Sequence, residues 1–174
     1  IRTQNIGPVT LTTLLRRYNS GLSVIEHLPE LSERSKIKIN LFSKAKAEDE
    51  LSKVEKLGGK IIVRGEADYP DILKYFDDAP GCLTCLGHPH LLQNPMLSMV
   101  GSRNASFNAL NLTRHMANEI GKAGYSVVSG MARGIDTAAH EGSIETGSIA
   151  VMAGGVDQIY PRENTKLYER LKSE

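Results

Sequence analysis

The chain has 174 residues, of which 40% are hydrophobic and 24% are charged, and it contains no tryptophan. This composition is typical of a globular protein with one substantial core and a small companion module, and its apolar runs are too short to cross a bilayer. Basic and acidic residues nearly balance, 13 against 12 in residues 1–95 and 8 against 8 in residues 96–174. We therefore expect a cytoplasmic protein without membrane contact, and any nucleic acid would have to be held by a few localised donors.

The first 43 residues predict a small helical module. Gly7-Pro8 precedes an apolar stretch that is expected to form a helix from Val9 to Tyr18, and a second helix is expected from Leu22 to Leu28, ending before Pro29. A Gly-Pro turn between short helices occurs in helix-hairpin-helix and sterile-alpha-motif-like units, but it is also an ordinary turn. DNA contact by this module is therefore left open.

From residue 44 to residue 174 the pattern is that of an α/β domain. The apolar spacing in Lys44–Leu57 predicts a charged helix, and Ile61–Val63 is expected to be a short strand. Strands and helices then alternate, with strands expected at Leu83–Leu86, Met96–Val100, Tyr125–Val128 and Ile149–Ala153 and helices near Ser106–Lys122 and Ile135–Glu145. This alternation of short apolar runs predicts a parallel sheet covered by helices on both faces.

Cys82 and Cys85, followed by His88 and His90, superficially have the order of a zinc knuckle. The surrounding Gly-Cys-Leu-Thr-Cys-Leu-Gly has strand composition, however. Positions three apart on a strand project from opposite faces, where two thiolates could not share one tetrahedral ion. We therefore expect two reduced, half-buried cysteines, and no metal.

Two strand-to-helix corners carry residues suited to holding a phosphate. The first corner is Met-Val-Gly-Ser-Arg-Asn, residues 99–104, and the second corner is Ser-Gly-Met-Ala-Arg-Gly, residues 129–134. The first N–H groups of a helix lack intrahelical acceptors, and glycine lets a phosphate approach them. Ser102 and Ser129 add hydroxyl donors, and Arg103 adds a planar cationic fork. With Gly154-Gly155 after the next strand, these corners are expected to share one sheet edge.

Asp136 and His140 lie four residues apart, on one helix face, and have the spacing of an acid–base pair. No activated nucleophile accompanies them at a defined spacing. We therefore expect structural roles: Asp136 caps or pins the preceding turn, and His140 packs or hydrogen-bonds within the fold. Tyr160-Pro161 is similarly expected to be a rigid turn into the last helix, with Asn164 near the start of that helix.

Four segments together resemble the DNA-processing protein A family (DprA or Smf). They are Val-Gly-Ser-Arg-Asn-Ala-Ser (100–106), Ser-Gly-Met-Ala-Arg-Gly-Ile-Asp-Thr-Ala-Ala-His-Glu-Gly (129–142), Ile-Ala-Val-Met-Ala-Gly-Gly-Val-Asp (149–157) and Tyr-Pro-Arg-Glu-Asn (160–164). The resemblance covers about residues 60–174 closely and the helical front end loosely.

This resemblance implies a Rossmann-like, doubly wound parallel sheet preceded by a small helical domain, and a family domain that continues beyond Glu174. It also implies a non-enzymatic, cytoplasmic protein, without a cofactor, that binds incoming single-stranded DNA in natural transformation. Such proteins help to load the recombinase RecA and typically form homodimers. Carried over by motif, the DNA- and phosphate-binding residues would be Gly101, Ser102, Arg103, Asn104, Ser129, Gly130, Met131, Ala132, Gly154 and Gly155.

The alternative is a nucleotide-binding or nucleotide-hydrolysing Rossmann-like enzyme related to the lysine-decarboxylase-like phosphoribohydrolases. Those enzymes carry a Pro-Gly-Gly-x-Gly-Thr-x-x-Glu turn, whereas the corresponding Ala-Gly-Gly-Val-Asp-Gln at 153–158 lacks the threonine and the glutamate. No Gly-x-Gly-x-x-Gly follows any predicted strand, so a dinucleotide site is disfavoured too. The absence of the threonine and the glutamate favours binding over hydrolysis.

Overall fold

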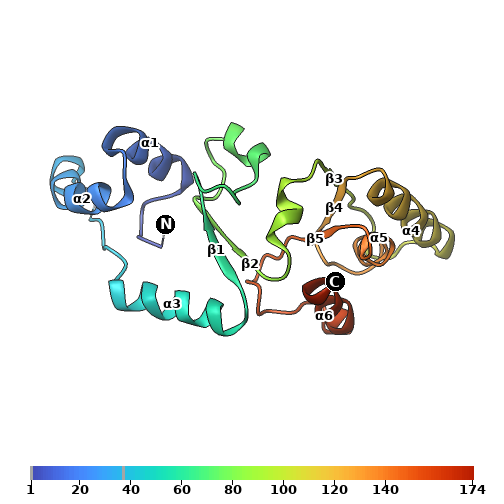
Figure 1. The fold of residues 1–174 in the computed structure, drawn as a ribbon. Helices are drawn as coiled ribbons and strands as arrows, with labels where there is room; N and C mark the ends of the chain where they lie inside the picture. The colour runs from blue at the N-terminus through green and yellow to red at the C-terminus, as the bar shows by residue number, and fades with distance from the viewer. Residues whose placement is uncertain (1, 37) are drawn as a thin grey trace. The chain divides into compact units, whose positions relative to one another are not determined.

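The computed structural model describes residues 2–36 and 38–174. The chain forms two compact units, the first made of residues up to Leu57 together with Ile61–Leu83 and the second of Gly58–Lys60 and Thr84–Glu174. These units are defined by contacts in space and do not test the predicted domain boundary after residue 43. That boundary stays a prediction. Figure 1 shows the elements of each unit in chain order.

The described residues of the first unit form the helices α1 (Pro8–Tyr18), α2 (Gly21–Ser35) and α3 (Lys44–Lys56) and a 3-10 turn η1 (Asp71–Tyr75). The Ser20 hydroxyl caps α2 by accepting the Ser23 N–H at 3.1 Å. The core of this unit forms around Ile6, Val24 and Leu28. The three predicted helices are confirmed.

One predicted boundary in this unit is wrong, because α2 continues through Pro29 to Ser35. Pro29 is exposed, and it removes a single amide donor from the helix. Leu28 is buried in the core and Leu31 packs against it. Burial on both sides of the proline therefore outweighs its local cost.

Two short strands, β1 (Lys60–Val63) and β2 (Cys82–Cys85), pair in a two-stranded sheet. Both cysteines of β2 are half-buried, which confirms the predicted strand environment. Burial raises the pKa of the Cys82 thiol above its ordinary value. Within residues 2–36 and 38–174, no group of three or more His, Cys, Asp or Glu side chains is arranged to hold a metal ion.

The second unit is built on a parallel sheet in the order β3-β4-β5. Its strands are β3 (Met96–Ser98), β4 (Ser126–Ser129) and β5 (Ser148–Ala150). Its helices are α4 (Phe107–Lys122), α5 (Ile135–Ser143) and α6 (Thr165–Ser173). Two 3-10 turns, η2 (Pro89–Gln93) and η3 (Arg162–Asn164), complete the unit. Met96 pairs with Ser126, and Val127 pairs with Ser148. The predicted alternation of strand and helix is confirmed from β3 to β5, whereas the strand predicted at Leu83–Leu86 forms as β2 and pairs with β1 outside this sheet.

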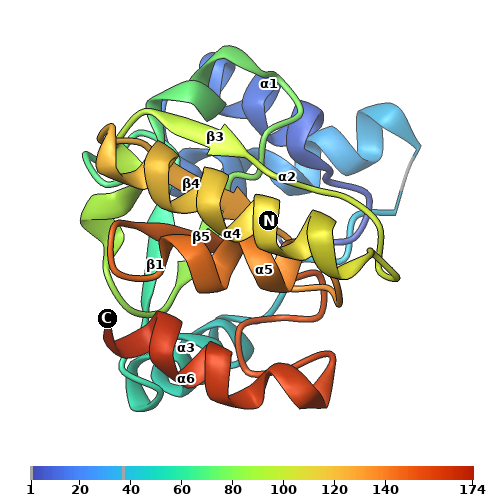
Figure 2. The same ribbon diagram turned by 90° about the vertical axis from the view of Figure 1, so that its right-hand side faces the viewer.

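Helices α4 and α5 lie side by side on one face of this sheet (Figures 1 and 2). Both connections step in the same direction, from β3 to β4 and from β4 to β5, and right-handed crossovers of that kind place their helices on one face. Ala117 of α4, Val127 of β4 and Ala139 of α5 form the buried centre of this layer.

The carboxyl ends of the three parallel strands share one edge, as the sequence predicts. The first corner therefore follows β3, the second corner follows β4, and the loop with Gly154 and Gly155 follows β5. Among the described residues, no helix combines the length and the apolar character that crossing a membrane requires.

Candidate anion-binding site

The first corner presents an uncommitted positive charge. Arg103 is exposed, and in the described part of the chain its guanidinium makes no hydrogen bond or ion pair. Its loop is held locally, because the Ser102 hydroxyl accepts the Asn104 N–H at 3.1 Å. Helix α4 begins just after this loop, where the Ser106 hydroxyl caps the helix by accepting the Ala109 N–H at 3.3 Å. The arginine thus projects from a loop that is tied at both ends.

The second corner uses its polar groups inside the protein. The Ser129 hydroxyl is buried and donates to the carbonyl oxygen of Met99 at 2.7 Å. The N–H groups of Gly130 and Ala132 both donate to Oδ2 of Asp136, at 3.2 and 3.3 Å. The predicted role of Asp136 as the residue that pins this turn is confirmed. The same carboxylate occupies two of the amide donors that the motif offers to a phosphate.

The two corners lie against each other at Gly134. The Ile135 N–H donates to the Ser102 carbonyl oxygen at 3.2 Å. A Cβ at Gly134 would lie 2.3 Å from that same oxygen, and the residue has a φ of +76°. Only glycine allows both the contact and the backbone conformation. The sequence analysis did not predict this contact. A usable signal was that Gly134 directly precedes α5 and has no side chain with which to cap that helix.

His140 is part of the architecture under the second corner. Its side chain is fully buried, and its Nδ1 lies 2.8 Å from the Ser148 hydroxyl, which in turn lies 3.0 Å from the Ser143 hydroxyl. Burial lowers the pKa of His140 to about 4, so the ring is neutral at pH 7. The predicted structural role of this histidine is confirmed.

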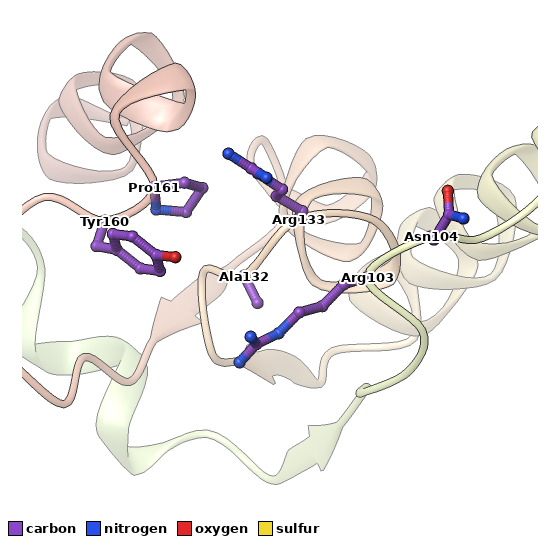
Figure 3. Close-up of a pocket in the computed structure, with 6 residues that line it drawn as sticks. All are labelled: Arg103, Asn104, Ala132, Arg133, Tyr160 and Pro161. Carbon is purple, nitrogen blue, oxygen red and sulfur yellow. The ribbon is translucent and has the colours of Figure 1, made fainter.

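A pocket of about 360 Å³ opens between the two corners and the segment after β5. Figure 3 shows its six lining residues, which are Arg103, Asn104, Ala132, Arg133, Tyr160 and Pro161. Arg103 and Tyr160 extend toward the same space beside Ala132, and Asn104 lies at the opposite end from Tyr160 (Figure 3). The volume falls in the range of small-ligand sites, roughly 300–1,000 Å³.

The segment at residues 160–164 is fixed to the second corner. The Asn164 side-chain amide donates to the Met131 carbonyl oxygen at 3.0 Å and to the Thr137 hydroxyl at 2.9 Å. The Pro161 side chain is fully buried. The predicted turn into the last helix is confirmed. The same anchoring brings Tyr160 to the pocket, which sequence reasoning missed.

Of the described residues, those that line the pocket include two arginines and no acidic side chain. Arg133, the other residue that sequence reasoning missed, is paired with Glu163 through an Nη2–Oε2 distance of 2.9 Å. Its charge is therefore largely compensated, whereas that of Arg103 is not. This arrangement can bind a single anionic group beside Arg103.

The structure separates the predicted site residues into four groups. Arg103, Asn104 and Ala132 line the pocket; Gly101 and Ser102 form the backbone that carries Arg103; and Ser129, Gly130 and Met131 serve packing and internal hydrogen bonds. Gly154 and Gly155 follow β5 but are not among the lining residues. Their part in DNA binding stays a prediction.

Comparison with known proteins matches both parts of the chain. Residues 60–174 match the family model described as DNA recombination-mediator protein A, and residues 1–52 match a DprA-like N-terminal HHH domain. The chain is 38% identical over 106 residues to the DNA processing protein DprA of Bacillus subtilis, covering 59% of this chain and 36% of that protein. It is 32% identical over 128 residues to protein Smf of Escherichia coli, covering 72% and 34%. The chain therefore spans about a third of the length of these relatives.

Two solved structures are similar in fold. The X-ray structure of DprA from Streptococcus pneumoniae superposes with a TM-score of 0.67 at 24% identity, covering 97% of this chain and 65% of that one. DNA processing protein A from Helicobacter pylori superposes with a TM-score of 0.57 at 29% identity, covering 66% of this chain and 52% of that one. Its structure gives insights into the unique single-stranded DNA binding mode of that protein.

Proposed function

The chain belongs to the DNA recombination-mediator protein A family, and from that membership we propose that it binds single-stranded DNA, with a backbone phosphate held by Arg103. The observation that carries the proposal is the uncommitted guanidinium of Arg103 at the mouth of a pocket without an acidic lining residue. A guanidinium matches a phosphate in shape and charge. The single-stranded DNA binding described for the relative from Helicobacter pylori supports the choice of ligand.

Binding is expected to be local and dependent on salt. The chain has a formal net charge of only +1, so no broad cationic surface assists Arg103. Backbone contacts read no base sequence directly. A logarithmic salt slope of about 0.7 is expected for each phosphate that is neutralised, so a site with one uncompensated arginine should show a shallow salt dependence.

We propose further that the protein acts without catalysing a reaction, in the cytoplasm, as a homodimer that helps to load RecA on incoming DNA. These parts of the proposal rest on the family resemblance. Binding rather than hydrolysis is also supported by the positions of Asp136 and His140, which are engaged in internal hydrogen bonds and do not line the pocket.

The direct test is Arg103→Ala, titrated against a fluorescent thymidine oligonucleotide by anisotropy. Loss of a charge-assisted contact of this kind weakens binding about 10- to 150-fold, and the salt slope should fall by about one. The melting temperature should be nearly unchanged, because Arg103 is exposed. Lys122→Ala is the control for a change in net charge, since it removes a positive charge, paired with Glu119, at the far end of α4.

Equal affinities of Arg103→Ala and the unmodified protein would contradict the proposal, as would an affinity that does not respond to salt. A gel-shift comparison of single-stranded oligonucleotides, duplexes and mononucleotides separates this function from the nucleotide-enzyme alternative. We expect single strands to bind best. Preferential binding of mononucleotides would favour the alternative instead.

A further inference from the structure

Large aromatic side chains are exposed at several places in this chain, including Tyr75 (84%) and Phe107 (74%), but of these described residues Tyr160 is the one that lines the pocket. It is 73% exposed while it lines the pocket. Two other tyrosines have structural roles. Tyr69 is fully buried, and its hydroxyl donates to the Pro80 carbonyl oxygen at 2.6 Å. Tyr168 is half-buried, and its hydroxyl donates to the Val156 carbonyl oxygen at 2.7 Å. Packing and internal hydrogen bonding therefore do not account for the position of Tyr160.

The backbone that carries Tyr160 is nevertheless fixed. The next residue, Pro161, is fully buried, and Asn164 ties the segment to the second corner through two side-chain hydrogen bonds. A tyrosine ring has few rotatable bonds, so a ring on a fixed backbone loses little conformational entropy when a ligand covers it. The structure thus presents an exposed aromatic ring from an ordered support.

We infer that Tyr160 is the stacking platform for one unpaired base, beside the position at which Arg103 holds the phosphate. The inference rests on the proposed function and deepens it, because it specifies a subsite for the base. Arg103 and Tyr160 extend into the same space beside Ala132 (Figure 3), and the pocket volume suits one small group rather than a long strand.

A base-stacking subsite would favour single strands over duplexes. In a duplex each base is covered on both faces by its neighbours and is paired along its edge, so stacking on a protein ring requires costly unstacking. An unpaired base has a face available. Because every base has such a face, stacking discriminates strand state without reading sequence.

The experiment compares two ligands of equal length and charge, which are an oligothymidylate and the same backbone with abasic residues. Affinities are measured by anisotropy for the unmodified chain, Tyr160→Ala, Tyr160→Phe and Arg103→Ala. Tyr125→Ala is the matched control, because Tyr125 is 42% exposed and directly precedes β4, at the opposite end of that strand from the second corner.

Tyr160→Ala should weaken oligothymidylate binding about 5- to 150-fold, the range that one base–aromatic stack supports. It should leave binding of the abasic strand unchanged, and Tyr160→Phe should bind both ligands as the unmodified chain does. The inference is overturned if Tyr160→Ala binds oligothymidylate normally, or if it weakens both ligands equally. Arg103→Ala weakens both ligands if the proposed function holds, so a failure of that function is seen separately.

A second measurement does not depend on how the variants fold. An oligonucleotide containing 5-iodouracil is irradiated on the unmodified chain, and the attached peptide is identified by mass spectrometry. Attachment at Tyr160 supports the stacking position. Attachment only at other residues, or none under conditions in which anisotropy shows saturation, overturns it.

Discussion

The first corner leaves its charged side chain in solvent, whereas the polar groups of the second corner form hydrogen bonds inside the protein. Arg103 is exposed and uncommitted, but Ser129 is 2% exposed and bonded to Met99. Two amides of the second corner are held by Asp136. Two similar glycine–serine turns at neighbouring strand ends thus differ in structure: the first leaves a charged side chain exposed, and the second fixes the backbone beside it.

The carboxylate of Asp136 accounts for this difference. It accepts backbone N–H groups where a phosphate oxygen would otherwise do so, and its negative charge repels an anion at that position. The phosphate is therefore expected near Arg103, with the second corner acting as a support. Gly134, at which the corners meet, is the most sensitive place to test this division.

Gly134→Ala should give the largest effect. Its Cβ would lie 2.3 Å from the Ser102 carbonyl oxygen, and the φ of +76° disfavours any residue with a side chain. Overpacking and backbone strain together suggest a loss of about 3–4 kcal/mol in the free energy of unfolding, measured by urea denaturation. DNA affinity should fall as well, since the new atom displaces the loop that carries Arg103.

Gly21→Ala is the control for this substitution, because nothing lies within 4 Å of the added Cβ and the site begins a helix. It should be neutral or slightly stabilising. If Gly134→Ala kept full stability, the two corners would be independent loops, and the support role of the second corner would have to be abandoned.

Asp136→Ala should have the next largest effect, and mainly on stability. Removal of the carboxylate leaves the amides of Gly130 and Ala132 without their acceptor, which costs about 2–3 kcal/mol. Asp49→Ala, which breaks a surface pair with Lys53, should cost less than about 1 kcal/mol. Thermal denaturation measures both. If the amides of the second corner bind phosphate directly, Asp136→Ala would instead raise DNA affinity while the fold persists.

The pH dependence of stability should reveal His140 beneath the second corner. Its pKa in the folded state is about 4, below the ordinary 6.5, so unfolding takes up a proton when the pH lies below about 6.5. Stability is therefore lost as the pH falls toward 4, by about 2 kcal/mol at pH 5. His140→Asn should flatten this dependence, and His115→Asn, on the exposed side of α4, should not. Equal slopes in all three chains would contradict the burial argument.

The elements of the second unit were predictable because their signals are local. Short apolar runs indicate buried parallel strands, and Ser106 indicates the start of α4. The end of α2 was not predictable, because burial of Leu28 and Leu31 outweighs the local effect of Pro29. Tertiary packing decides that boundary, and no local pattern reports it.

The site was predictable only in part for the same reason. Arg103 stands in a recognisable turn, so its type and spacing indicate anion binding. The pocket also needs Tyr160, which arrives through the hydrogen bonds of Asn164 with Met131 and Thr137, residues about thirty positions away. The sequence around Tyr160 predicts a turn, and only the folded chain shows that this turn completes the wall of the pocket.

The smallest expected effect concerns Arg133, the one charge of the second corner that lines the pocket. Glu163 compensates it, so Glu163→Gln should raise affinity for single-stranded DNA about two- to five-fold at low salt, as expected for an exposed pair. Glu169→Gln, which releases Lys172 on α6 instead, is the control. An increase specific to Glu163→Gln would show that Arg133 contributes its charge to ligand binding once the carboxylate of Glu163 is removed. Unchanged affinity would leave Arg103 as the arginine that carries binding, and would confine the second corner to support.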